Sequence, residues 1–157
     1  MDTIYVFIVI IILSVSFSII KRLIRSYRLQ QLLFALQEKN TGLFQKLVNS
    51  KINLILFPKY NLEYLKLNGY ILEKNSEMIE EQFKVLNQYV LSKEQRKDLL
   101  LKKLTYYTTT KSEKAMETLK MISDFKDTDF LSKAQEIYAK LITDIKNERI
   151  RSSQIFL

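Results

Sequence analysis

The fold is decided by residues 4–20, IYVFIVIIILSVSFSII, a run of seventeen residues without a charge, a glycine or a proline. A helix that rises 1.5 Å per residue covers ~25 Å over this length, just short of the ~30 Å hydrocarbon core of a bilayer. Thr3 on one side and Leu23 with Ile24 on the other can supply the remaining length. The run therefore predicts a transmembrane helix.

Two other structures could account for this run. A secretory signal peptide begins with a basic segment and ends in small residues at a cleavage site. Here Met1-Asp2-Thr3 carries an acid, and the run ends in Ser18-Ile19-Ile20-Lys21. A core helix of a soluble protein usually has a polar face, but this run contains only three serines and one tyrosine. We therefore expect a retained, single-pass membrane anchor.

Basic residues directly follow the run and indicate its orientation. No base precedes the run, whereas four membrane-proximal bases follow it: Lys21, Arg22, Arg25 and Arg28. Lys and Arg collect on the cytoplasmic side of short flanking segments. We therefore expect the N-terminus outside and the remainder of the chain in the cytoplasm.

The net charge of +8 is concentrated beside the run. Residues 21–60 hold eight bases and one acid, while residues 61–157 hold seventeen bases and fifteen acids. A nucleic-acid-binding domain carries its basic face within the folded domain, so this distribution argues against a nucleic-acid partner. Anionic lipid headgroups attract juxtamembrane bases by about 1 kcal/mol each. Membrane lipids are therefore the expected partner of the basic segment.

Composition excludes several kinds of site and favours helices. The chain has no cysteine and no histidine, which excludes disulfides, thiol catalysis, and the commonest general base and transition-metal ligand. Two glycines and one proline leave few turn formers for a β-rich fold. We expect an all-α protein with an anchor over residues 1–22, a cytoplasmic stack of antiparallel helical hairpins over residues 23–150 and a tail over residues 151–157.

Three segments of the expected hairpin stack are alike. They read EKNTGLFQKLVNSKI from residue 38, EKNSEMIEEQFKVLN from residue 73 and TKSEKAMETLKMIS from residue 110. We expect Thr41, Ser76 and Ser112 to cap the helices, at spacings of 35 and 36 residues. A period near 34 residues with two helices per unit resembles the tetratricopeptide repeat, over about residues 29–145. An irregular helical bundle is the other fold compatible with the pattern.

The resemblance to tetratricopeptide repeats implies a kind of function. Domains of that family act as assembly scaffolds, and stacks of helical hairpins bind peptides or helices on a concave face. The first helices of successive units line that face. Candidate partner-binding residues lie on such helices, at positions that the spacing of the apolar residues predicts to be exposed: Lys66, Glu73, Lys102 and Lys103.

No pattern in the chain points to catalysis, a cofactor or a metal ion. The tightest carboxylate group, Asp124, Asp127 and Asp129, lacks the central glycine and closing glutamate of an EF-hand loop. We interpret it as helix capping. The two glycines are isolated, so there is no phosphate-binding loop, and no serine has a histidine base. We expect a protein that is not an enzyme and has no small-molecule substrate.

Two functions of different kinds are compatible with these features. The first is a membrane-anchored interaction domain that presents the helical stack to an unknown protein partner in the cytoplasm. The second is a small accessory subunit of a membrane complex for transport or secretion. There the transmembrane helix makes the specific contacts, with Ser14 and Ser18 forming a small-residue seam. Residues 155–157, Ile-Phe-Leu, could also dock on a partner.

Overall fold

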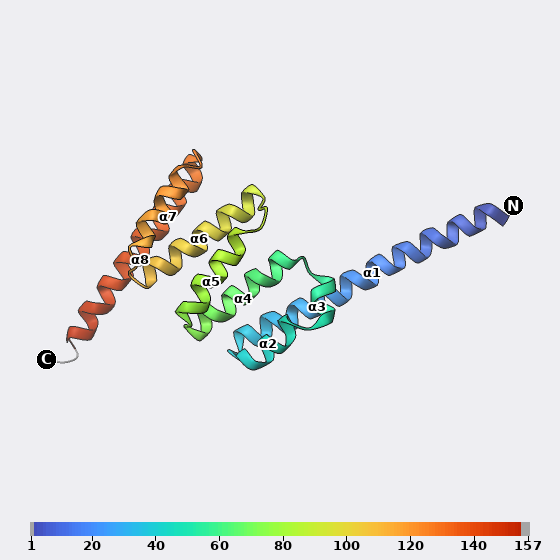
Figure 1. Ribbon diagram of the computed structural model, residues 1–157, viewed down its shortest axis with the longest axis horizontal. Coiled ribbons are helices and arrows are strands. Elements are labelled where there is room, and N and C mark those ends of the chain that lie inside the picture. The colour runs from blue at the N-terminus through green and yellow to red at the C-terminus, as the bar shows by residue number, and fades with distance from the viewer. Residues whose placement is uncertain (1, 155–157) are drawn as a thin grey trace. The chain divides into compact units, whose positions relative to one another are not determined.

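The computed structural model describes residues 2–154, with side chains described for residues 4–147. The described residues form eight helices and no strand, which confirms the all-α prediction (Figure 1). The helices are α1 (Asp2–Gln37), α2 (Thr41–Val48), α3 (Lys51–Leu56), α4 (Lys59–Glu73), α5 (Ser76–Asn87), α6 (Lys93–Thr109), α7 (Lys114–Ser123) and α8 (Thr128–Gln154). Contacts divide the chain into two compact units, Met1–Tyr89 and Val90–Leu157.

Helix α1 is 36 residues long and combines two environments in one element. Every side chain in residues 4–20 is exposed, whereas Leu32 and Ala35 near the other end are buried. The residues from Ile4 to Gln37 form the one described helix that is long and apolar enough to cross a membrane. The boundary predicted near residue 22 marks a change of composition, and no break in the helix accompanies it. The predicted tail begins inside α8, and residues 155–157 lie outside the described part of the chain.

The first unit is built on the second half of α1. Helices α2, α3 and α4 all pack against α1, and α5 packs on α4 as the second arm of a hairpin (Figure 1). The buried apolar core joins three of these helices, α1, α2 and α4, with the residue before Pro58: Leu32, Ala35, Phe44, Val48, Phe57 and Leu62. Burying a side chain of this size contributes about 1.5–3 kcal/mol. The packing therefore holds the C-terminal half of α1 firmly in the unit.

The short helix α3 is fixed by two polar contacts at its beginning. The Ser50 hydroxyl accepts a hydrogen bond from the Asn53 backbone N–H at 3.4 Å. The Asn53 side chain is fully buried and donates to the carbonyl oxygen of Leu47, in the last turn of α2, at 2.7 Å. A helix of six residues has little stability of its own. These contacts and the burial of Phe57 hold α3 in place.

The turns between paired helices share one backbone conformation. Lys39, Lys74 and Lys111 have φ values of 53°, 55° and 57°, in the left-handed region. In each turn the N–H of the next residue bonds the carbonyl five positions earlier, at 2.9–3.1 Å, as in a Schellman motif. Lys126, between α7 and α8, has a φ of 52°. Helix pairs therefore do recur along the chain, with left-handed lysines 35 and 37 residues apart.

All three predicted capping residues lie one position away from the residue that precedes the helix. The Asn40 side chain, not Thr41, accepts from the Leu43 N–H at 3.0 Å, and Asn75, not Ser76, accepts from the Met78 N–H at 3.2 Å. The left-handed lysine before each asparagine ends the preceding helix abruptly, so the next helix begins one residue early. The Ser112 hydroxyl accepts from the Lys114 N–H at 3.4 Å, while Glu113 is the residue preceding α7.

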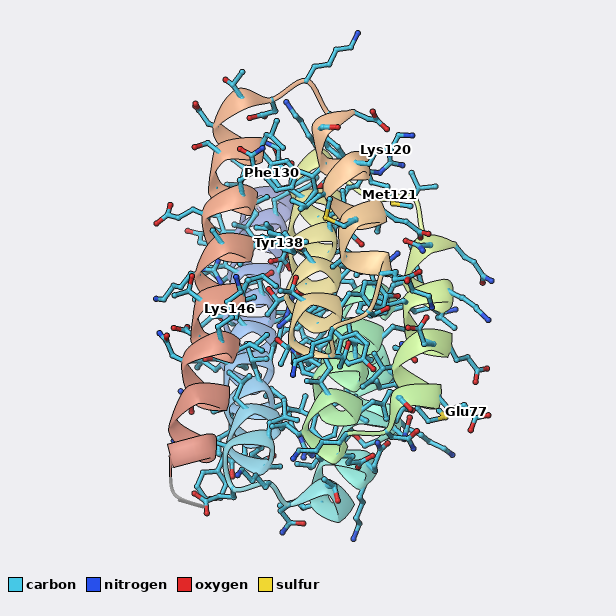
Figure 2. All side chains as sticks on the ribbon, turned by 90° about the vertical axis from the view of Figure 1, so that its left-hand side faces the viewer. Glu77, Lys120, Met121, Phe130, Tyr138 and Lys146 are labelled. Atoms are coloured by element: carbon cyan, nitrogen blue, oxygen red, sulfur yellow. The ribbon has the colours of Figure 1, made fainter. Side chains whose placement is uncertain are left out.

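The second unit is a group of three helices in which every pair is in contact. The Ser92 side chain opens α6 with a complete capping box, because Gln95 bonds back to the Ser92 backbone N–H. On α8, Phe130 and Tyr138 lie on the side that packs on α6 and α7, whereas Lys120 lies on the exposed side of α7 (Figure 2). The core of this unit is made of Leu99, Leu100, Leu104, Tyr107, Ala115, Ile122, Phe130 and Ala134.

The close approach of α2 to α4 depends on Gly69. A Cβ atom at this position would lie 2.7 Å from Cε1 of Phe44, whose ring is fully buried. The other glycine, Gly42, is exposed, and the nearest atom to a Cβ there would be 3.9 Å away. The two glycines are therefore a matched pair, one tightly packed and one open.

We expect Gly69→Ala to destabilise the protein by about 1 kcal/mol. Alanine gains about 1 kcal/mol of helix propensity, but overpacking against the immobile Phe44 ring costs about 1–3 kcal/mol. The control Gly42→Ala has only the first effect, and it should stabilise by up to about 1 kcal/mol. Urea unfolding of the full chain in detergent, followed by circular dichroism, measures both changes. A stabilised Gly69→Ala protein would contradict the packing described for α2 and α4.

Candidate functional site: the basic segment behind the apolar helix

The four membrane-proximal bases lie on consecutive turns of α1. Lys21, Arg22 and Arg25 are exposed, and Arg28 is half-buried. Spacings of four and three residues place Lys21, Arg25 and Arg28 on one face of the helix. Among the described side chains, no carboxylate forms an ion pair with any of the four. Their positive charge is therefore available to an anionic surface.

Two of these bases are held by contacts within the first unit. The Arg25 guanidinium carbon lies 5.4 Å from the ring centroid of Phe57, a cation–π distance. Arg28 Nη1 donates to Gln31 Oε1 at 3.1 Å, and Gln31 Nε2 donates to the Tyr27 hydroxyl at 3.0 Å. The basic segment is thus part of a packed structure, which the sequence pattern alone did not indicate.

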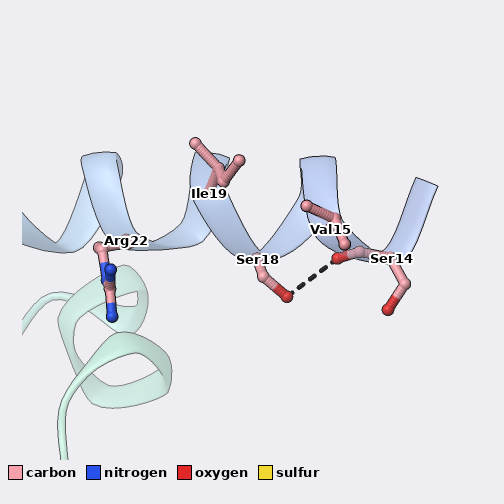
Figure 3. A pocket seen from close by; sticks show the side chains of 5 residues that line it. All are labelled: Ser14, Val15, Ser18, Ile19 and Arg22. Atoms are coloured by element: carbon pink, nitrogen blue, oxygen red, sulfur yellow. Dashed lines mark hydrogen bonds between the residues drawn. The ribbon is translucent and has the colours of Figure 1, made fainter. Parts of the chain in front are cut away.

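The two serines of the expected packing seam lie in the apolar part of α1. A shallow depression there is lined by Ser14, Val15, Ser18, Ile19 and Arg22 (Figure 3). The Ser18 hydroxyl donates to the backbone carbonyl of Ser14 at 2.9 Å. The hydroxyl proton of Ser18 is therefore donated within the helix.

The candidate partner-binding residues on α4 occupy different environments. Glu73, the last residue of α4, is exposed as expected. Lys66 is half-buried, and its Nζ lies 2.8 Å from Glu63 Oε1. The other carboxylate oxygen of Glu63 accepts from the buried side chain of Gln82 on α5 at 2.7 Å. Lys66 therefore belongs to a polar network that joins α4 to α5, and the expectation that it is exposed was wrong.

Lys102 and Lys103 lie side by side in the middle of α6, and both are half-buried rather than exposed. The physical reason is that α6 packs against both α7 and α8. Its covered surface is therefore larger than that of a helix with a single neighbour. The structure does not bring these lysines together with Lys66 and Glu73 in one unit, because the division of the chain falls between them.

Asp127 is the carboxylate with the strongest contacts in the second unit. Its Oδ1 accepts from the Phe130 N–H at 3.1 Å and caps α8, as the sequence predicts. Its Oδ2 lies 2.6 Å from Lys97 Nζ and 3.5 Å from Lys93 Nζ on α6. The Lys97 ammonium also lies 5.2 Å from the ring centroid of Phe130. No group of three metal-ligating side chains occurs among the described residues, Asp124 and Asp129 included.

These contacts set the protonation of Asp127. The hydrogen bond from Lys97, with that from the Phe130 N–H, lowers the pKa of this carboxyl from 3.8 to about 2. A carboxyl whose pKa is lower in the folded state stabilises the fold above its unfolded pKa. This contribution is complete above about pH 4 and disappears as the pH falls to about 2.

We expect Asp127→Asn to lower the melting temperature at neutral pH, with the deficit shrinking as the pH falls from about 4 to about 2. Asparagine still caps the helix, so the change removes the charge and the lysine contacts alone. Thermal unfolding of the full chain in detergent at several pH values measures the deficit. The control Asp124→Asn makes the same charge change at an exposed residue and should give a smaller deficit. An Asp127→Asn deficit that does not vary with pH would contradict the assignment.

Comparison with known proteins gives no relative for this arrangement. No protein-family model, no curated protein and no solved structure matches the chain. The tetratricopeptide resemblance is thus confirmed only as far as an all-helical chain with packed helix pairs behind a long apolar helix.

Proposed function

We propose that this chain is a single-pass membrane protein whose N-terminal helix anchors a non-catalytic, helical interaction domain at the cytoplasmic face. One observation carries the anchoring: residues 4–20 are uncharged, and the folded chain covers none of their side chains. Soluble proteins rarely expose an apolar surface of this extent. A bilayer would remove the whole run from water.

Retention of the helix is supported by its continuity with the core. Leu32 and Ala35, on the same unbroken helix, are buried against Phe44 and the rest of the first unit. The residues before Lys21 also lack the small-residue cleavage pattern of a signal peptide. The four bases that follow the run have no carboxylate partner among the described side chains, and they support a cytoplasmic location for the helical units.

The interaction role is supported by the kind of surface that the helices offer. The described residues combine helix pairs with exposed charged faces. The rival function, in which α1 makes the specific contacts, rests on the short Ser14 and Ser18 seam alone, and the hydroxyl proton of Ser18 is donated within α1. We therefore favour α1 as an anchor and the helical units as the partner-binding part.

A reporter that is active only in the cytoplasm should be active when fused after Leu157. Replacing Lys21, Arg22, Arg25 and Arg28 by glutamine, together with Asp2→Lys and Thr3→Lys, should give a mixture of orientations, because the charge bias is then reversed. Alkaline carbonate extraction and the intact mass of the membrane-bound protein complete the measurement. A silent reporter would refute the orientation, and release of a shortened protein would identify the run as a signal sequence.

The partner-binding role predicts that Glu73→Lys reduces capture of a protein partner from solubilised membranes several-fold. Reversing an exposed charge at an interface slows association without disturbing the fold. Glu81→Lys makes the same change at an exposed position on α5, the second helix of the pair, and should leave capture unchanged. Equal capture by both variants, at unchanged melting temperature, would exclude the α4 end from the interface.

A further inference from the structure

Helix α3 presents an apolar face that the protein leaves uncovered. Ile52, Leu54 and Ile55 are 48%, 51% and 78% exposed, while Asn53 between them is fully buried. Lys51, which is exposed, lies four residues before Ile55 and therefore on the same face of the helix. A rigid turn of helix that exposes three large aliphatic side chains beside a lysine is typical of a segment that contacts a membrane surface.

Helix α3 packs on α1 close to the end of the uncharged run. The Arg25 guanidinium stacks over Phe57, directly after α3, at 5.4 Å. Arg25 is five residues beyond Ile20, which ends the uncharged run, so it lies ~7.5 Å further along the helix axis. The headgroup layer of a bilayer is about 5–8 Å deep on each side. If the uncharged run fills the hydrocarbon core, α3 is placed at the depth of the headgroups.

The charges around α3 identify the occupant of its apolar face. Between Thr3 and Leu62 the chain contains a single acid, Glu38, against eight Lys and Arg. Figure 3 shows Arg22 on the side of α1 that faces the neighbouring short helix, and α3 packs on α1 in this unit. Apolar side chains that lie among basic residues without carboxylate partners complement an anionic lipid surface. The headgroups of such a surface are negative, and its acyl boundary is apolar.

We propose that α3 is a second membrane contact, in which Ile52, Leu54 and Ile55 insert at the acyl boundary while Lys51 and the α1 arginines bind anionic headgroups. This inference rests on the proposed membrane anchoring of α1. Its consequence is that the first unit lies against the bilayer surface in one orientation. The buried Asn53 amide and the Phe57 ring hold the apolar face ready before it meets the lipid.

The chain has no cysteine, so single-cysteine variants of the full chain report one position each. We would place a nitroxide label at Ile55→Cys, at Leu13→Cys in the middle of the run, and at Val90→Cys, where the native side chain is fully exposed. The protein is reconstituted in vesicles of phosphatidylcholine and phosphatidylglycerol. Collision rates of the label with oxygen and with a water-soluble nickel chelate measure the depth of each label.

The expected result is a depth at Ile55 between those of the two reference positions. Leu13 should favour oxygen, Val90 should favour the nickel chelate, and Ile55 should be protected from nickel several-fold relative to Val90. An Ile55 label as accessible to nickel as Val90, with Leu13 still in lipid, would overturn the proposed α3 contact and leave the anchor intact. Nickel access at Leu13 would overturn the anchor and α3 contact together. Spin–spin broadening at Ile55 would identify a second copy of the chain as the occupant.

A charge reversal tests the role of the anionic headgroups. Lys51→Glu, made with the Ile55 label, should remove most of the protection, and vesicles of phosphatidylcholine alone should do the same. Since Lys51 is the first residue of α3, a glutamate there suits the helix dipole and should not unfold the helix. The matched control is Lys84→Glu, at an exposed position on α5. Equal protection in both variants and in both kinds of vesicle would show that no headgroup recognition occurs.

Discussion

The structure depends on one helix whose two halves have different surroundings. Residues 4–20 of α1 offer only apolar side chains and receive no cover from the protein, whereas Leu32 and Ala35 are core residues of the first unit. No loop separates these two parts of the helix. Whatever surrounds the apolar run therefore lies at a fixed distance from α2, α3 and α4. The basic residues between the two parts mark the change of surroundings, and none has a carboxylate partner among the described side chains.

Much of the fold could be read from local sequence, because helices depend on local signals. The long apolar run, the scarcity of glycine and proline, and the cap at Asp127 indicated the right elements. The errors at Thr41 and Ser76 arose because the left-handed lysines before Asn40 and Asn75 cannot be told from ordinary helix-ending lysines. The burial of Lys66, Lys102 and Lys103 depends on which helices become neighbours. The spacing of apolar residues indicates which face of a helix is buried, but it does not indicate how many other helices pack against that helix.

The same limit applies to the candidate site. The position of Lys21, Arg22, Arg25 and Arg28 after the run was evident in the sequence, and their charge needed no structure. The contact of Arg25 with Phe57 joins residues 32 positions apart and could not be foreseen from either segment. Nor could the exposure of Ile52 and Ile55, since a short apolar stretch is usually packed against a core. Here the opposite is found, because the side chain of Asn53 occupies the buried face of α3 and the aliphatic side chains therefore point outward.

The unbroken course of α1 also has a mechanical consequence. A membrane helix longer than the local hydrocarbon thickness tilts, and membrane helices are inclined by ~20° on average. Helix α1 contains neither glycine nor proline where it leaves the apolar run, so a tilt is carried into the first unit rather than absorbed at a hinge. From Ile20 to Gln37 the helix forms a lever of ~25 Å, and each ~10° of tilt moves its far end by ~4 Å. If α1 spans a bilayer as proposed, the thickness of that bilayer would thereby set the angle of the hairpin of α4 and α5 relative to the membrane surface.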